Sequence, residues 1–343
     1  MNSVWNLLDD LKKKKGVTEI IINSPEYVYI ERDGELIRLN VEIKDKDLFD
    51  FSLDVATRAH KKFDAEHPII DDVIDDGSRI NMVHQSYTEG YPAITIRKYL
   101  QNINSLDELD GKFLITDRWI QFLKSLVVSK SNIIVSGGTS SGKTTMLNLL
   151  LQEIHPTERI VTIEDTRELN FEAPNHVSLI SAPNFTHLQN PLDTRVLVRN
   201  TLRMRPDRII IGEVRGAEAF DLLQAMNTGH DGSMCSVHAN SPAESLKRIE
   251  NLYLLSGYTV PLKAVREQMS TSIDFIVHLG RNRENQRCIT RISEVSNMEG
   301  DTILTQEIGR LGDHGLEFTG LVPKNVNKLF EAGLDRNFFQ DLE

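Results

Sequence analysis

The stretch 137–144, Gly-Gly-Thr-Ser-Ser-Gly-Lys-Thr, constrains the fold of this chain more than any other feature. It follows a short apolar run at 132–136 and precedes an expected helix at 145–153. A glycine-rich loop between a buried strand and a helix binds phosphate, because its backbone N–H groups and the helix N-terminus attract the anion. The plain alternative is a glycine turn that a lysine happens to follow. Because the loop and both flanks match, we predict a nucleotide-binding α/β domain.

Each residue type in this loop has its own expected task. Gly137 or Gly142 can adopt positive φ without a Cβ clash, and the glycines let the main chain approach the phosphates. Lys143 is expected to reach the β- and γ-phosphates, and the Thr144 hydroxyl to bind Mg²⁺. The residues expected to contact the nucleotide here are Gly138, Thr139, Ser140, Ser141, Gly142, Lys143, Thr144 and Thr145. ATP and Mg²⁺ are therefore the expected substrate and cofactor.

Length and composition narrow the class of protein. The 343 residues suggest two domains. No apolar run approaches the roughly 18 residues of a membrane span, and the first residues do not have the form of a signal peptide. Cys235 and Cys288 stand far apart, which favours a reducing compartment and argues against a zinc module. The formal net charge of −11 gives no sign of a nucleic-acid-binding face, so we expect a cytoplasmic protein with no direct nucleic-acid partner.

The first hundred residues predict a small α+β domain, 1–100. Helices are expected at 1–11 and 44–62. Strands are expected at 18–23, 27–31, 35–39, 79–84 and 93–98. The Asp33-Gly34 pair between two of these strands is a good hairpin turn.

The pattern changes after a polar stretch at 101–115, which is expected to be a linker. From residue 116 a helix is followed by strands that mostly alternate with helices, which indicates a largely parallel sheet covered on both faces. The expected strands are 132–136, 159–164, 208–212, 233–237 and 273–279. We therefore expect a second domain at 116–343, with a β-rich portion at 281–343 and a short acidic tail.

Carboxylates follow two of these strands, at the edge where parallel sheets bind ligands. After the first come Glu164, Asp165 and Glu168. Glu168 is expected to orient or activate an attacking water, and Glu164 and Asp165 to hold Mg²⁺-bound water or arginine partners. After the second, Glu213 takes the place of a Walker B acid, although Gly212 stands between it and the strand. The plain alternative for both is a solvated acidic turn.

Two histidines, His230 and His238, flank the expected strand at 233–237. His238 follows the strand, where the acids gather, and we expect it to sense the γ-phosphate. A zinc site lacks a third ligand with suitable spacing nearby. A lone histidine is more often structural, and this remains the alternative.

Arginines are dense in the sequence. One group surrounds the Walker B region and comprises Arg195, Arg199, Arg203, Arg205, Arg208 and Arg215. Two more, Arg79 and Arg97, lie on expected strands of the first domain. An arginine over the γ-phosphate accelerates phosphoryl transfer by about a thousandfold or more, and it often comes from another domain or subunit. Surface salt bridges are the alternative for most of them.

The four blocks in this order resemble the secretion and pilus ATPase superfamily, the hexameric motors of type II and type IV secretion and type IV pili. Its Walker A, Asp box, Walker B and His box correspond to 137–144, 164–168, 209–213 and 229–238. Finer features are most similar to the CpaF/TadA branch, which serves tight-adherence pili. These features lie at 17–23, 202–208, 212–219 and 298–301. The four-cysteine insertion of many type II secretion ATPases and the long N-terminal extension of the CpaF type are absent.

The resemblance implies a RecA-like P-loop ATPase domain at the C-terminal side and a smaller PAS-like N-terminal domain. The chains would form a homohexamer in which each N-terminal domain packs on a neighbour's C-terminal domain. ATP would lie between the two domains of one chain, and Arg79 and Arg97 would cross to its phosphates. The partners would be inner-membrane platform proteins, which would hold the motor at the inner face of the cytoplasmic membrane.

The resemblance also assigns roles within the second domain. Glu168 matches the catalytic glutamate, Glu213 the Walker B acid that holds Mg²⁺ through water, and His230 and His238 the His box. These roles predict a motor that powers pilus assembly. Three rivals remain: a RecA-like nucleic-acid translocase, a small-molecule P-loop kinase, and a ring member that does not hydrolyse ATP.

Overall fold

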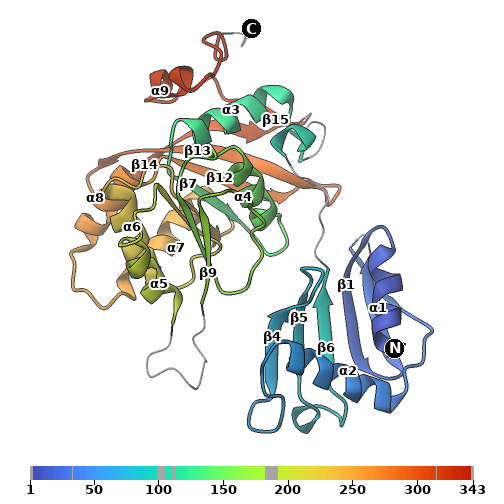
Figure 1. Cartoon of the computed structure of the whole chain (residues 1–343). Helices are drawn as coiled ribbons and strands as arrows, with labels where there is room; N and C mark the ends of the chain where they lie inside the picture. Colours follow the sequence, from blue (N-terminus) through green and yellow to red (C-terminus); the bar gives the residue numbers. More distant parts are fainter. Residues whose placement is uncertain are drawn as a thin grey trace. The chain divides into compact units, whose positions relative to one another are not determined.

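The computed structural model describes residues 3–32, 34–98, 105–109, 113–181, 192–313 and 315–340. The chain divides into two compact units, Met1–Asn102 and Ile103–Glu343 (Figure 1). No helix among the described residues is long and apolar enough to cross a membrane.

The first unit is a six-stranded antiparallel sheet in the order β3-β2-β1-β6-β5-β4. Its strands are β1 (Val17–Ser24), β2 (Tyr27–Arg32), β3 (Glu35–Arg38), β4 (Ile69–Val73), β5 (Arg79–Val83) and β6 (Ala93–Arg97). Alternate apolar side chains of the strands, such as Ile20 and Ile80, form a buried core with α1 (Ser3–Lys13) and α2 (Asp45–Arg58). The edge strand β4 was not predicted, because Asp71 and Asp72 interrupt its apolar pattern.

The second unit is built on a nine-stranded mixed sheet in the order β15-β14-β13-β12-β7-β11-β10-β8-β9. Six strands run parallel: β7 (Ile133–Gly137), β8 (Ile160–Glu164), β9 (His176–Ile180), β10 (Arg208–Ile211), β11 (Met234–His238) and β12 (Phe275–Arg281). The antiparallel extension is β13 (Arg287–Glu299), β14 (Thr302–Leu311) and β15 (Leu316–Phe318). The strands β7, β8 and β10 are buried along their whole length because both faces of the sheet are covered.

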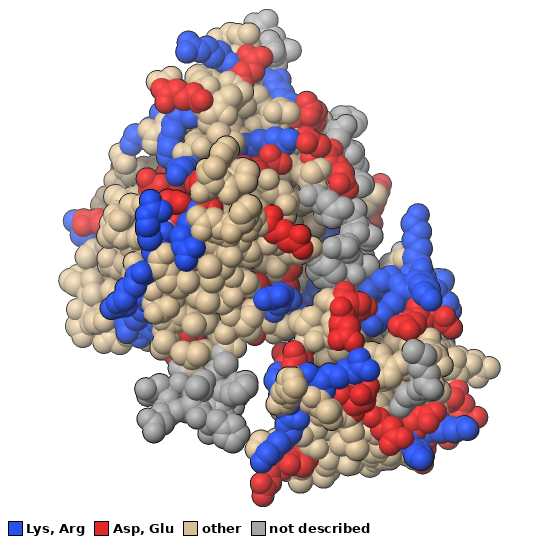
Figure 2. All heavy atoms as spheres, in the orientation of Figure 1, with Lys and Arg blue, Asp and Glu red and all other residues tan. Residues whose placement is uncertain are grey.

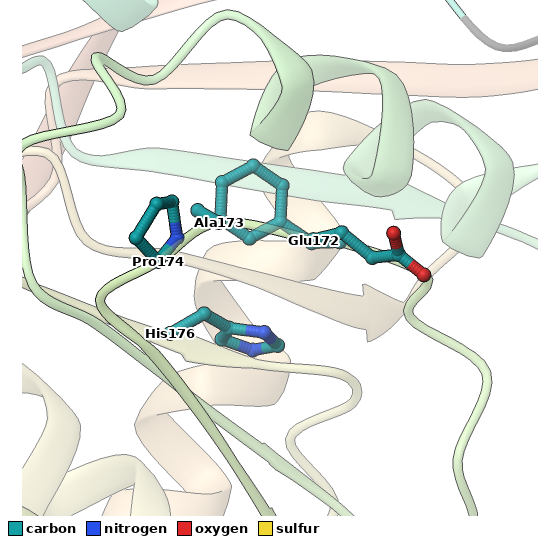
Figure 3. Close-up of a pocket in the computed structure, with 5 residues that line it drawn as sticks. Glu172, Ala173, Pro174 and His176 are labelled. Carbon is teal, nitrogen blue, oxygen red and sulfur yellow. The ribbon is translucent and has the colours of Figure 1, made fainter.

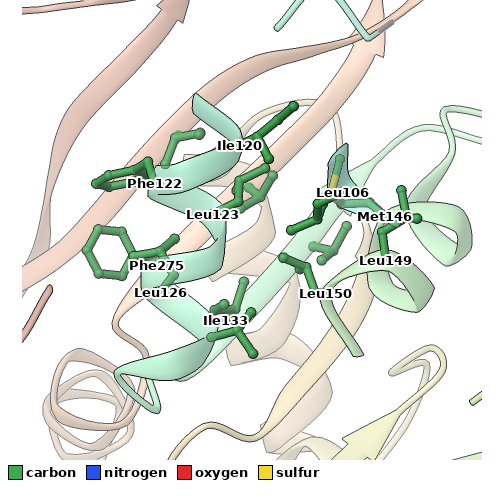
Figure 4. Packing of buried hydrophobic residues seen from close by; sticks show 14 of the residues in the cluster. Leu106, Ile120, Phe122, Leu123, Leu126, Ile133, Met146, Leu149, Leu150 and Phe275 are labelled. Atoms are coloured by element: carbon green, nitrogen blue, oxygen red, sulfur yellow. The ribbon is translucent and has the colours of Figure 1, made fainter. Parts of the chain in front are cut away.

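Two hydrophobic cores lie against this sheet. The first contains the apolar sides of α3 (Asp117–Val128) and α4 (Lys143–Gln152). Figure 4 shows side chains of these helices packed over Ile133 of β7 and Phe275 of β12. The second core contains the helices α5 (Thr194–Thr201), α6 (Glu218–Asn227), α7 (Pro242–Leu254) and α8 (Leu262–Ser272).

The edge strand β9 was not predicted, because polar and apolar residues are mixed in its sequence.

The last part of the chain differs from the expected acidic tail. After β15, the short helix α9 (Val326–Glu331) leads to Phe338 and Phe339, and both rings are buried. Phe338 stacks on Phe122 and meets Phe318 edge to face. The expectation of a tail was wrong up to residue 340, since these aromatic rings belong to the first core of the unit. The same core contains Leu106 and Leu109, which lie within the stretch 101–115.

Candidate nucleotide site

The candidate site lies where the parallel strands β7, β8, β10 and β11 end. Neighbouring strands are in parallel register, with His238 beside Gly137 and Ile211 beside Ile163. The residues that follow these positions therefore meet at the carboxyl ends of the strands. This is where parallel sheets with helices on both faces bind ligands.

The loop between β7 and α4 has the conformation of a phosphate-binding loop. Ser140 and Gly142 adopt positive φ, 57° and 100°, which turns successive N–H groups toward one side. Gly142 ends the loop in the left-handed region and precedes the first residue of α4. A Cβ on Gly142 would lie 3.1 Å from the Phe113 ring, and a Cβ on Gly137 would lie 2.6 Å from the Leu279 carbonyl oxygen. Glycine is therefore required at both positions.

Lys143 is directed back into this loop. Its Nζ donates a hydrogen bond to the Gly138 carbonyl, at 2.8 Å, and lies 3.4 Å from Nε2 of His238. The side chain is buried although it is charged. A buried ammonium whose donors point into a glycine-rich loop fits an anionic group such as a phosphate.

A first carboxylate, Glu168, lies against the start of α4. Its Oε2 accepts a hydrogen bond from the Thr144 hydroxyl at 3.1 Å. This contact brings the expected Mg²⁺-binding hydroxyl and the expected catalytic carboxylate into one place. Thr144 stands on the helix and Glu168 in the segment after β8, so the tertiary fold creates the pair.

Glu164, the last residue of β8, is buried beneath this pair. Its Oε1 accepts hydrogen bonds from the backbone N–H groups of Glu168 and Leu169, both at 2.8 Å. Burial raises the pKa of Glu164 to about 7, although the two N–H groups act in the opposite direction. The observed hydrogen-bond partners of Glu164 are backbone N–H groups, whereas an arginine or a Mg²⁺-bound water was expected from the sequence.

Glu213 lies between a cation and a histidine. Arg215 Nη2 donates to its Oε2 at 2.8 Å, and His238 Nε2 lies 3.4 Å from its Oε1. Burial would raise the pKa of Glu213, but the Arg215 hydrogen bond and charge outweigh it and lower the pKa. Burial and the nearby Lys143 lower the pKa of His238, which favours the neutral imidazole.

Asp165 connects neighbouring elements beside the site through its hydrogen bonds. Its Oδ1 accepts hydrogen bonds from the Ser181 and Thr194 hydroxyls, at 2.7 and 3.0 Å. Its Oδ2 lies 3.5 Å from Arg215 Nη1. Asp165 thereby connects the ends of β8 and β9 with the start of α5.

The structure does not bring His230 to this place. His230 precedes β11, whereas His238 is its last residue, so the two histidines lie at opposite ends of this strand. The Nδ1 of His230 lies 3.2 Å from the Ala225 carbonyl oxygen, and its own carbonyl accepts from the Ser233 hydroxyl at 2.7 Å. His230 therefore connects α6 with β11.

Several of the arginines near the Walker B block have structural partners. Arg195 and Arg199 both pair with Asp221 on α6, at 2.9 Å each. Arg208 is 1% exposed and forms a bidentate pair with Glu158, at 2.8 and 3.0 Å. The alternative of a surface salt bridge therefore holds for Arg195 and Arg199, whereas Arg208 is buried and its ion pair lies inside the unit.

Arg79 and Arg97 belong to the first unit, where they stand directly opposite each other on β5 and β6. Arg79 Nη2 lies 3.5 Å from Asp71 Oδ2. Glu19 of β1 stands beside Arg97 on its other side, so each of the two arginines has an acidic neighbour within the sheet.

Two polar contacts of the site were not predicted from the sequence. Asn148, one turn after Thr144 on α4, donates to the Glu168 carbonyl at 3.1 Å. Its spacing of four residues from Thr144 was a usable signal. Arg287 of β13 donates to the Ser140 carbonyl at 3.1 Å, and nothing local in the sequence connects residues 147 positions apart.

A separate pocket of about 450 Å³ opens beside β9 and is lined by Phe171, Glu172, Ala173, Pro174 and His176 (Figure 3). The His176 ring meets Phe171 edge to face, and its Nε2 lies 3.0 Å from the Thr162 hydroxyl. None of the candidate site residues lines this pocket, and it is not part of the nucleotide site.

The parallel sheet, the glycine-rich loop and the separate first unit define this chain as an α/β protein of the RecA-like P-loop type with an N-terminal domain. Residues 6–311 match the family described as type II/IV secretion system protein, and the chain belongs to this family.

Two relatives and one solved structure illustrate the likeness. The conjugal transfer protein TrbB of Rhizobium radiobacter is 33% identical over 288 residues, which are 83% of this chain and 84% of TrbB. A putative conjugal transfer protein of Mycobacterium tuberculosis is 30% identical over 301 residues, which are 86% of this chain and 85% of that protein. The ATPase DotB of Legionella pneumophila superposes with a TM-score of 0.59 at 19% identity, covering 86% of this chain and 81% of that chain, so it shares the fold.

Proposed function

We propose that this chain is an ATPase that hydrolyses ATP to ADP and phosphate and couples the reaction to mechanical work. The observation that carries the proposal is the meeting of Lys143, Thr144, Glu168, Glu213 and His238 where the parallel strands end. Phosphoryl transfer to water needs a phosphate-binding cation, a metal-binding hydroxyl and carboxylates for water and metal, and this set contains each of them.

Each residue has a proposed task in this reaction. Lys143, whose ammonium now donates to Gly138, donates to the β- and γ-phosphate oxygens. Glu168 orients the attacking water and accepts its proton, while the oxygen between the β- and γ-phosphates leaves with ADP. His238, held neutral by its surroundings, forms a hydrogen bond with the γ-phosphate.

The residues present fit a magnesium ion. Mg²⁺ prefers oxygen ligands and retains several waters, and the Thr144 hydroxyl and the Glu213 carboxylate would hold it, the latter through water. When bound, the ion neutralises charge on the β- and γ-phosphates. The lowered pKa of Glu213 keeps its carboxylate ionised for this task.

A ring is the proposed working form. Six chains form a homohexamer, with each PAS-like N-terminal domain packed on a neighbour, and ATP lies between the two domains of one chain. Arg79 and Arg97 reach the phosphates and release them after hydrolysis. Different affinities of closed and open states for ATP and ADP supply the work. The resemblance to the secretion and pilus ATPases supports this role, because arginines at the matching positions of that family cross to the phosphates.

The proposed machine is a tight-adherence pilus, whose inner-membrane platform proteins bind the ring at the cytoplasmic face of the membrane. The sequence resemblance to the CpaF/TadA branch supports this choice. Conjugal transfer is the second candidate, because TrbB at 33% identity is named for it. Figure 2 shows acidic and basic side chains interspersed over the face in view.

The experiment is to replace the proposed Walker B acid, Glu213→Gln. The variant should bind ATP with a dissociation constant within about threefold of that of the parent and lose more than about 99% of turnover, because it loses a charge that acts in hydrolysis. Strains carrying it should lack surface pili and retain DNA transfer. Normal turnover in the variant would contradict the site assignment, and lost DNA transfer with intact pili would favour the conjugal machine.

A further inference from the structure

The segment that carries Glu168 is held along one face of α4. Thr144, Asn148 and Gln152 stand four residues apart, so they line one side of the helix. Asn148 donates to the Glu168 carbonyl at 3.1 Å and accepts from the Asn170 N–H at 2.7 Å. Gln152 donates to the Asn170 carbonyl at 3.1 Å. The helix that begins at the phosphate-binding loop therefore fixes the register of this segment.

Glu164 holds the same segment from the other side. Its Oε1 is the common acceptor of the Glu168 and Leu169 N–H groups, at 2.8 Å each. The carboxyl is 4% exposed, and its Oε2 is buried without a hydrogen-bond partner in the part of the chain that the structure describes. A buried acceptor shared by two successive N–H groups fixes the main chain there, because breaking either bond leaves a buried polar group unpaired.

Gly212 makes room for this arrangement. A Cβ at Gly212 would lie 3.0 Å from Glu164 Cγ, a contact tighter than side chains normally accept. This accounts for the glycine that separates the β10 strand from Glu213. The Walker B strand and the segment after β8 are thus fitted to each other through the Glu164 side chain.

We propose that Glu164 and Asn148 are positioning residues, which fix the main chain at Glu168 so that its carboxylate meets the Thr144 hydroxyl. Neither has to touch the substrate, since both act on the backbone of a residue that does. A catalytic group displaced by about 1 Å can cost on the order of 100-fold in rate. The inference rests on the proposed function for its effect on turnover, whereas the hold on the main chain is independent of it.

The first test compares two substitutions of Glu164. Glu164→Gln keeps an acceptor oxygen and should retain at least about one third of the parent kcat. Glu164→Ala removes the acceptor and should lower kcat at least tenfold, while the dissociation constant of a fluorescent ATP analogue stays within about threefold. Equal loss in both variants would overturn the proposal, because the charge of Glu164 would then be what matters. An unchanged kcat in Glu164→Ala would overturn it too.

Asn148 gives a variant that does not open the core, since the side chain is only partly buried. Asn148→Ala should lower kcat about threefold to tenfold with analogue binding unchanged. The comparison variant is Gln152→Ala, which loses only the contact with the Asn170 carbonyl, two residues beyond Glu168, and should lower kcat less than twofold. Equal effects of the two variants, or none in Asn148→Ala, would contradict a specific hold on Glu168.

A double mutant tests whether Glu164 acts through Glu168. If it does, Glu164→Ala should change kcat by less than twofold in a chain that already carries Glu168→Gln. If the double variant loses kcat by the product of the two single losses, Glu164 has a role independent of Glu168, and the proposal is overturned.

Amide hydrogen exchange at residues 168 and 169 tests the hold without ATP turnover. Exchange should be at least tenfold faster in Glu164→Ala than in the parent and nearly unchanged in Glu164→Gln. If the parent chain hydrolyses no ATP but shows this pattern, the proposed function fails and the hold stands. Equal exchange in the parent and Glu164→Ala would overturn the hold itself.

Discussion

The buried carboxyl of Glu164 combines a stabilising contact with an energetic cost. It accepts two backbone hydrogen bonds, yet it lies where an ionised group is poorly solvated. Its pKa is therefore raised from 4.5 to about 7. For an acid with a raised pKa in the folded state, the stabilising contribution is complete below the unfolded value and is lost as the pH rises through the folded value.

Because the parent loses stability as the pH rises, Glu164→Gln should differ from it in a pH-dependent way. Gln cannot ionise, so the stability of the variant relative to that of the parent should rise between pH 4.5 and pH 8, on the order of 3 kcal/mol, because the variant lacks the cost of ionising a buried carboxyl. Thermal unfolding of both proteins across this range measures the change. A stability difference that does not vary with pH would show that Glu164 keeps an ordinary pKa.

The single residues of the site were predicted to different extents. The loop 137–144 and the acids Glu168 and Glu213 were named from the sequence, because strand ends are visible in apolar runs. The contact of Thr144 with Glu168 was not, since it depends on the path of the chain after β8. The position of His230 and His238 at opposite ends of β11 was expected, but the contact of His230 with the Ala225 carbonyl of α6 was not.

Among the secondary-structure elements, strands with continuous or alternating apolar residues were predicted, including the edge strand β3, whereas the edge strands β4 and β9 were not. β7, β8, β10, β11 and β12 are central and buried, so each gives a strong signal. β4 and β9 lie at sheet edges, where polar residues are tolerated and the pattern is weak. The aromatic cluster at the end of the chain was missed for a different reason: its partners on α3 are about two hundred positions away.

The C-terminal element should contribute strongly to the stability of the second unit. Phe338→Ala removes a buried ring that contacts Trp119, Phe122 and Phe318, and such truncations cost about 3–5 kcal/mol. The matched control is Leu321→Ala, whose side chain is exposed and should matter by less than about 0.5 kcal/mol. Urea unfolding of both variants measures the difference. A near-parental value for Phe338→Ala would show that the element is not docked.

At the scale of the whole molecule, the proposed account is that two units cooperate on one nucleotide. The loop, the acids and the neutral histidine belong to the second unit, and Arg79 and Arg97 belong to the first. The α/β class of the second unit was accessible from the sequence, because helices and strands alternate there. Assembly into a ring is not a pattern in the sequence; it was inferred only from the family resemblance.

The central claim is that the loop at 137–144 serves ATP hydrolysis, and phosphate release by the purified full chain tests it most directly. With ATP and Mg²⁺ and without any acceptor, the parent chain should release phosphate continuously. Lys143→Ala should release it at least 100-fold more slowly, because the ammonium that binds the β- and γ-phosphates is gone. Equal rates in the parent and the variant, or no release by the parent, would contradict the account.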